Sequence, residues 1–144
     1  MLYTFDIKKC LILVGPAIIS GFADGEALSI ELDDDLYQKQ TGADGDVARS
    51  RRHGLAGNAK ITLMQTSPSN DVLSAYSILD QTLNAGVVPL TVKDLLGRTA
   101  IFAPYAWVKK PAPASFGKEL TNREWVLDLA TVELFIGGNA PMLF

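Results

Sequence analysis

The sequence has little of what catalytic and disulfide-bonded proteins need. It contains one cysteine, Cys10, and one histidine, His53. A single cysteine excludes a disulfide within the chain and fits a reducing compartment. His53 stands in a polar, glycine-rich stretch where nothing orients it, and the G-x-S-x-G nucleophile motif does not occur. We therefore expect Cys10 to be a small buried residue and the chain to have no enzymatic activity.

The sequence also lacks the basic surface that nucleic-acid-binding proteins carry. The net charge is −3, and charged residues make up 20% of the chain. The phosphate-cradling motifs G-x-x-x-x-G-K-[ST] and G-x-G-x-x-G are absent. The aromatic run Phe102–Trp107 precedes Lys109 and Lys110, but it fits a strand alternating into a core better than a single-strand binding site.

The sequence has no apolar run long enough to cross a membrane. Leu11–Ile19 follows Lys8 and Lys9 and so superficially resembles a signal peptide. However, Gly15-Pro16 would break a helix in the middle of this run, and Asp6 lies where a signal peptide is positive. We expect two buried strands joined by a Gly15-Pro16 corner, and no membrane insertion.

Acidic residues cluster twice, without the spacing of a calcium loop. Asp33-Asp34-Asp35 has neither the glycine nor the closing glutamate of an EF-hand, and Asp44-Gly45-Asp46 is only a fragment of one. Carboxylates in such short clusters are typical of solvated turns. We therefore expect no metal and no cofactor.

Short runs of strand-forming composition dominate the rest of the chain. With 144 residues, 48% of them hydrophobic, the chain fits a single domain spanning residues 1–144. Glycine-containing turn signals separate runs that predict strands; these are Leu11–Val14, Ala17–Ser20, Ala27–Leu32, Leu36–Gln40, Asn58–Gln65, Val87–Lys93, Thr99–Val108 and Arg123–Leu134. This spacing predicts a mainly β fold, an antiparallel sandwich or barrel.

One helix is expected, directly after a strand. Ser67 or Ser69 can cap it, and Pro68 suits its first turn. From Ser69 to Leu83 apolar residues recur at helical spacing and predict one buried stripe, formed by Val72, Tyr76, Leu79 and Leu83 and widened by Leu73 and Ala75. A single helix among many strands usually covers a sheet face or the end of a barrel.

The last predicted strand contains a change of phase. Trp125, Leu127 and Leu129 alternate with polar residues, but the apolar positions then shift to Val132 and Leu134. A β-bulge at Ala130-Thr131 would explain this shift.

Two connecting segments stand out. Gly42–Gly57 is predicted to be irregular, and a connection of this length is often functional. Lys109–Gly117 contains spaced prolines, which suit either a rigid exposed arm or an ordinary long hairpin loop.

Several segments, in order along nearly the whole chain, resemble the tail tube proteins of contractile-tailed bacteriophages. The stretch Leu63–Leu73 is the most specific of them, and the others are weaker alone. They are Ile19–Glu26, Gly42–Ser50, Leu63–Leu73, Val92–Asp94 with Gly97, Trp107–Pro111, Phe116–Glu119 and Arg123–Trp125.

The resemblance implies a compact β-sandwich or barrel with one flanking helix. It further implies hexameric rings joined sheet edge to sheet edge and stacked into a hollow tube that guides viral DNA into the host. The implied partners are further copies of the chain, the tail sheath, the tape-measure protein, and baseplate or hub and terminator proteins. DNA would pass without specific binding, and the protein would assemble in the host bacterial cytoplasm and become part of the virion.

Two other functions stay open at this point. An initiator or terminator ring of the same fold would form single rings and stop. A small β-barrel binding module or enzyme would stay monomeric or dimeric and carry a concave pocket.

Two sets of charged residues are candidates for roles in a tube. Charges of both signs in the Gly42–Gly57 segment suit a contact between rings: Asp44, Asp46, Arg49, Arg51, Arg52 and His53. Acids facing the lumen would repel DNA phosphates and let DNA slide, and the candidates are Glu26, Glu31 and Asp33.

Overall fold

The computed structural model describes residues 2–139. Its elements, in chain order, are a 3-10 helix at Ile7–Lys9, β1 Cys10–Val14, β2 Ala17–Ile18, β3 Leu28–Leu32, β4 Tyr37–Thr41, β5 Val47–Arg51, β6 Gly57–Met64, α1 Ser69–Leu83, β7 Val88–Asp94, β8 Ala100–Lys110, β9 Asn122–Leu129 and β10 Glu133–Phe135.

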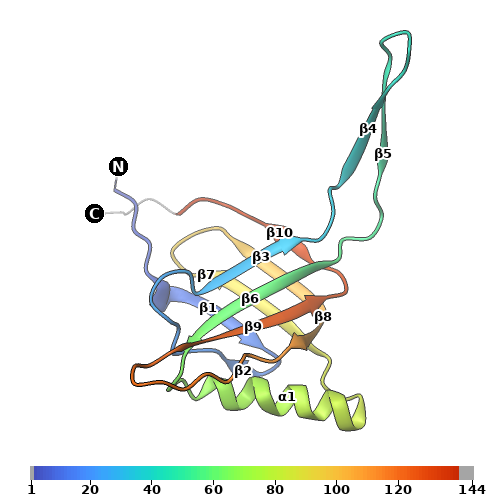
Figure 1. The fold of residues 1–144 in the computed structure, drawn as a ribbon. Helices are drawn as coiled ribbons and strands as arrows, with labels where there is room; N and C mark the ends of the chain where they lie inside the picture. The colour runs from blue at the N-terminus through green and yellow to red at the C-terminus, as the bar shows by residue number, and fades with distance from the viewer. Residues whose placement is uncertain (1, 140–144) are drawn as a thin grey trace.

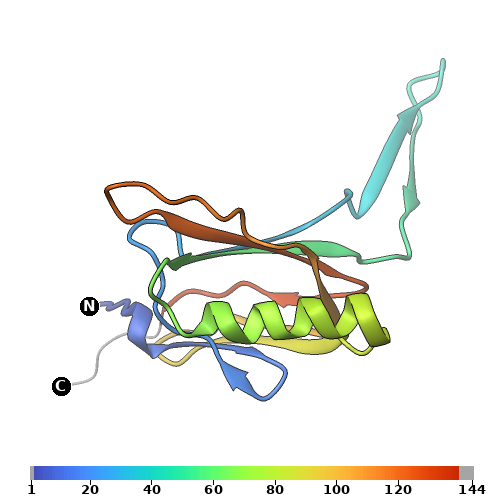
Figure 2. The same ribbon diagram turned by 60° about the horizontal axis from the view of Figure 1, so that its bottom comes forward.

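One large antiparallel sheet folds over on itself to make the body. Its strand order is β2-β1-β7-β8-β9-β6-β3, and β10 also pairs with β8. Figure 2 shows β3, β6 and β9 in one layer and β1, β7 and the start of β8 in the other. Helix α1 lies along one end of these layers (Figure 1). The expected mainly β fold with one flanking helix is therefore confirmed.

The core lies between the two layers and follows strand alternation. In β6, Ile61 and Leu63 are fully buried, whereas Lys60 and Met64 are exposed. Its neighbour β9 buries Leu127 directly opposite Ala59. These side chains therefore follow the period of two that a strand with one buried face has.

The junction between β6 and α1 is held by side-chain hydrogen bonds. The Ser67 hydroxyl donates to the Ser20 carbonyl at 2.6 Å and accepts the Ser69 N–H at 3.2 Å. In return, the Ser69 hydroxyl accepts the Ser20 N–H at 2.9 Å. The residue at the N-cap itself is Pro68. The two serines therefore tie the helix start to a distant loop rather than forming a simple cap.

The predicted helix is present, but its predicted buried stripe is wrong at the C-terminal end. Leu79 and Leu83 are exposed, and Leu83 keeps 69% of its surface accessible. The buried residues are Ser69, Leu73 and Ser77. Small serines let the helix backbone approach the sheet closely, so the helix turns this face inward rather than its most apolar one.

The N-terminal apolar run forms a hairpin, as expected, but only one of its strands is buried. β1 and β2 pair through Leu13 with Ile18, and the Gly15-Pro16 corner joins them. Ile18 is exposed because β2 is at the margin of the sheet. Among the described helices, none is long and apolar enough to cross a membrane.

The bulge predicted at Ala130-Thr131 is wrong. Leu129 pairs with Ala106 in the same register in which Glu133 pairs with Phe102, so no residue is inserted between β9 and β10. Instead, β8 carries an extra residue twice, against β9 between Val108 and Lys110 and against β7 between Ala103 and Ala106. Pro104 lies in this stretch, where a bulge tolerates a residue without an N–H.

The proline-spaced segment after β8 is a long loop between antiparallel neighbours, as one of the two expectations had it. β8 and β9 pair from Lys110 with Val126 onward to Ala106 with Leu129. The loop is held to β9 because the Ser115 carbonyl accepts hydrogen bonds from Arg123 and from the Thr121 hydroxyl.

Candidate functional site

The most distinctive feature of the molecule is a β-hairpin that stands away from the body. β4 and β5 pair only with each other, and every residue of both strands is exposed. Figure 1 shows this hairpin projecting from the ends of β3 and β6. We call residues 36–53 the arm. The expectation that Gly42–Gly57 is irregular is therefore wrong, because β5 lies within it and pairs with β4.

The two faces of the arm differ in charge. Cross-strand partners share a face, and one face carries the pairs Tyr37 with Arg51, Lys39 with Arg49, and Thr41 with Val47. The Arg49 guanidinium lies 4.1 Å from the centre of the Tyr37 ring on this same face. The opposite face carries uncharged residues, namely Gln38, Gln40, Ala48 and Ser50. We call the first one the basic face.

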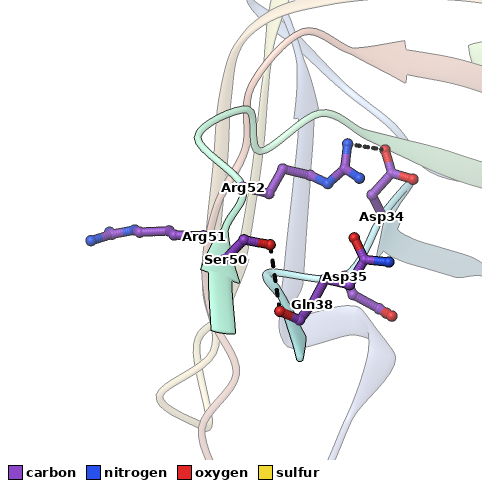
Figure 3. Close-up of a pocket in the computed structure, with 6 residues that line it drawn as sticks. All are labelled: Asp34, Asp35, Gln38, Ser50, Arg51 and Arg52. Atoms are coloured by element: carbon purple, nitrogen blue, oxygen red, sulfur yellow. Dashed lines mark hydrogen bonds and ion pairs between the residues drawn. The ribbon is translucent and has the colours of Figure 1, made fainter. Parts of the chain in front are cut away.

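Polar contacts join the two strands of the arm near its base, and one of them reaches Asp34 in the segment that leads into the arm (Figure 3). Arg52 forms an ion pair with Asp34 at 3.2 Å, and the Arg52 N–H donates to the Leu36 carbonyl. The Ser50 hydroxyl donates to the Gln38 carbonyl at 3.4 Å. Arg51 points away from these residues in Figure 3. A shallow cleft of about 410 Å³ at the base of the arm is lined by Asp34, Asp35, Gln38, Ser50, Arg51 and Arg52.

The residues expected to contact another ring all lie on the arm or at its base. Asp44 and Asp46 are at the tip, where the Gly42 N–H donates to the Asp46 carbonyl. Arg49 and Arg51 are on the basic face, and exposed His53 follows the arm's last strand. All six of these residues therefore belong to one projecting element. Their role in a contact between rings stays a prediction.

The three acids expected to face a lumen lie near β3. Glu31 is on the exposed side of this strand, because Ile30 and Leu32 pack against the core. Asp33 follows the strand and accepts a hydrogen bond from Asn58 at 3.1 Å. Glu26 is in the exposed loop before β3. Their role also stays a prediction.

Sequence reasoning missed an apolar groove of about 830 Å³. It lies between β3, at one margin of the folded sheet, and the first residues of β1, which β2 does not cover at the other margin. Its lining includes Phe5, Ile7, Cys10, Ile12, Phe22, Leu28, Ile30 and Met64, with Asp24 and Glu26. The apolar residues Phe5 and Ile7 were the signal available in the sequence, but no periodicity marks them. We call this feature the seam groove.

Cys10 is partly buried in the seam groove rather than fully buried. Burial, with a smaller effect from the charge of Asp94, raises the pKa of the Cys10 thiol. A raised pKa reduces the thiolate fraction and with it the reactivity of this cysteine. Over residues 2–139, no group of three His, Cys, Asp or Glu side chains is placed to hold a metal ion.

Comparison of the sequence with known families gives a match across nearly the whole chain. The model of the bacteriophage PhiTE tail tube protein family matches residues 3–137. The chain is also similar to the structural protein ORF10 of Pseudomonas phage KPP10, with 28% identity over 123 residues, covering 84% of this chain and 71% of that protein.

The fold resembles solved structures from contractile injection systems. The tube-terminating cap of the anti-feeding prophage gives a TM-score of 0.64 at 11% identity, covering 94% of this chain and 93% of the cap. The sheath/tube terminator of the extracellular contractile injection system PVC gives 0.65 at 15% identity, covering 94% and 99%. The sheath-tube complex of PVC gives 0.64 at 15% identity, covering 92% of each chain. At such identities the likeness shows a shared fold.

Proposed function

Because this chain belongs to the bacteriophage PhiTE tail tube protein family, we propose that it is the subunit of the tail tube itself. In this proposal, copies form hexameric rings, the rings stack into a hollow tube, and viral DNA passes through the tube during ejection. The family match carries the assignment, since it extends over residues 3–137 and leaves little of the described chain for another activity.

The free-standing arm supports an assembling subunit. A two-stranded hairpin alone is marginally stable in water, and all residues of β4 and β5 are exposed. A second copy that packs against the arm would stabilise it. The contact is heterologous if the arm meets a different surface of its neighbour, and heterologous contacts generate closed rings or open filaments.

The partners follow from the same proposal. A tube subunit contacts its own copies first, then a surrounding sheath, a tape-measure protein in the lumen, and hub and terminator proteins at the ends. The structural likeness to the PVC sheath-tube complex supports a sheath partner. The role is structural, without catalysis, and the protein becomes part of the virion.

A terminator ring is the second candidate. Two of the solved structures with this fold are a tube-terminating cap and a sheath/tube terminator, and their TM-scores of 0.64 and 0.65 do not separate them from the sheath-tube complex at 0.64. The fold therefore serves both roles. The difference lies in whether assembly continues after one ring.

Negative-stain electron microscopy of the purified chain, at low and high concentration, tests the proposal. Long hollow tubes of uniform width are the expected result. Single rings that do not stack at any concentration would favour the terminator. Monomers at every concentration would reject both the tube subunit and the terminator ring, and would favour a binding module with a concave pocket.

A further inference from the structure

We propose that the seam groove of one copy is the seat for the arm of a second copy. The basic face of the arm lies over the groove, Val47 enters it, and Lys39 and Arg49 pair with Asp24 and Glu26. This inference rests on the proposed function in one respect, namely that copies of this chain associate.

The basic face of the arm is incomplete by itself. Lys39 is directly opposite Arg49, and like charges in this position destabilise a strand pair. The Arg49 guanidinium stacks over Tyr37, but this contact does not neutralise either charge. Between residues 36 and 53 there are four Lys and Arg residues and two acids, so the arm is net positive in a chain of net charge −3. An anionic surface on a second copy therefore complements the basic face of the arm.

The same face also carries an unpacked apolar side chain near the tip. Val47 keeps 66% of its surface exposed and lies two residues from Arg49 on the same strand face. Burial of this side chain against a second surface would remove apolar area from water and so favour association. A suitable partner surface thus has an apolar hollow next to carboxylates.

The seam groove has this combination of features. Its floor is apolar and its volume of about 830 Å³ is large enough for several side chains. Asp24 and Glu26 are exposed residues in its lining. This seat gives Glu26 a role in a contact between copies in place of the lumen role suggested by its sequence.

The arm does not reach the groove of its own copy. It leaves the body after Leu32 and points outward in Figure 1, and the Arg52–Asp34 ion pair holds its base. The groove lies beside Leu28 and Ile30 on β3, toward the other end of that strand. The occupant is therefore the arm of a second copy. Because arm and groove are different surfaces, the contact leaves one of each free for further copies.

Disulfide trapping tests the contact, since Cys10 in the groove is the sole cysteine of the chain. A disulfide forms only when the two Cα atoms come within about 4.4–6.8 Å. Val47→Cys puts a thiol on the basic face, and Ala48→Cys puts one on the opposite face as a matched control. Mild oxidation of the assembled protein at alkaline pH, where more Cys10 is thiolate, should link Val47→Cys chains into covalent multimers severalfold more efficiently than Ala48→Cys chains.

A disulfide between the Val47→Cys thiols of two arms would also link chains. The double variant Val47→Cys/Cys10→Ser can form only this second kind of bond, and we expect it to give no multimers. Equal linking by Val47→Cys and Ala48→Cys, or none by Val47→Cys in particles that are seen to assemble, would overturn the seat while leaving the tube assignment intact. A wild-type chain that stays monomeric at every concentration would overturn the proposed function and the seat together.

A charge exchange gives an independent readout. Lys39→Glu/Arg49→Glu should abolish assembly while the thermal unfolding of the body stays unchanged. Adding Asp24→Lys/Glu26→Lys to the same chain should restore assembly, because the two ion pairs form again with reversed signs. Assembly by the arm variant alone, or failure of the four-site variant to recover it in a folded chain, counts against the seat.

Discussion

At the scale of single residues, the side chain of Asn70 links three elements of the fold, and nothing in the sequence around it predicts this role. Its side-chain amide donates to the Met64 carbonyl at 2.9 Å and to the Ser67 carbonyl at 3.1 Å. Its oxygen accepts the indole N–H of Trp125 at 2.9 Å. Asn70 therefore holds the end of β6, the start of α1 and the core side of β9 together.

We expect Asn70→Ala to lower the free energy of unfolding by about 1–3 kcal/mol, because the buried Trp125 N–H loses its acceptor. Urea denaturation monitored by tryptophan fluorescence measures this change. Asn122→Ala, at an exposed position, is the matched control and should stay within about 0.5 kcal/mol of the parent. Equal effects of both substitutions would show that the Asn70 network does not carry stability.

Reversing two charges at the base of the arm should block assembly without unfolding the chain. In Arg51→Glu/Arg52→Glu the lost Arg52–Asp34 ion pair is exposed, and exposed pairs contribute only about 0–1 kcal/mol. Circular dichroism should therefore stay native. Tubes should be absent in electron micrographs, because the two glutamates reverse the charge that the arm brings to the predicted contact between rings. Lys110→Glu/Lys118→Glu makes the same change in net charge elsewhere on the exposed surface and should still assemble. Normal-length tubes from Arg51→Glu/Arg52→Glu would contradict the prediction that these residues contact another ring.

At the scale of elements, alternation along the chain predicted most of the strands. Ile61, Leu63, Leu127 and Leu129 are buried as their spacing indicates, because each lies in a strand with one face on the core. Of the two strands of the arm, β4 was predicted as Leu36–Gln40, but β5 escaped prediction because it has no apolar alternation. Val47–Arg51 is exposed on both faces, so burial leaves no trace in its sequence.

The change of phase at Ala130-Thr131 was visible, but its cause was not. The irregularity lies in β8, which carries an extra residue against β7 and another against β9, and the segment between β9 and β10 follows the bent strand in unchanged register. A single sequence shows where the apolar phase of a strand changes. It does not show which of the paired strands carries the extra residue that causes the change. The seam groove was hidden for a similar reason, because it depends on two sheet margins that are distant in the chain.

The orientation of α1 gives a test at this scale. Leu73 is fully buried and Leu83 is 69% exposed, although both belong to apolar positions of one helix. Leu73→Ala should lower the free energy of unfolding by about 2–5 kcal/mol through loss of burial and a residual cavity. Leu83→Ala should change it by less than about 0.5 kcal/mol in the monomer. Thermal and urea unfolding of dilute protein compare the two, and a larger effect at Leu83 would mean that the helix packs through its other face.

At the scale of the whole molecule, the distribution of acids bears on how a tube would treat DNA. Glu31 lies on the exposed side of β3, and Asp33 follows it. If these acids face the lumen, Glu31→Lys/Asp33→Lys should make tubes retain DNA, because added lysines bind phosphates. Retention of labelled DNA by purified tubes measures this. Asp71→Lys/Glu119→Lys makes the same change in net charge at other exposed positions. Equal retention by the two variants would reject the lumen assignment.

The response of assembly to salt distinguishes the forces that join copies. Pairing between sheet edges depends on backbone hydrogen bonds, and burial of Val47 depends on the hydrophobic effect, so neither weakens much as salt is added. The charges of the arm behave differently, because the screening length falls from about 10 Å at 0.1 M to about 3 Å at 1 M. If the basic face docks against Asp24 and Glu26, the concentration needed for assembly should rise between 0.1 and 0.5 M sodium chloride, as measured by light scattering on a dilution series. The Lys39→Glu/Arg49→Glu/Asp24→Lys/Glu26→Lys chain should show the same dependence, since its ion pairs are reversed but equal in number. A critical concentration that falls with salt in both chains would mean that apolar burial governs the association and that the arm charges serve only to keep monomers apart.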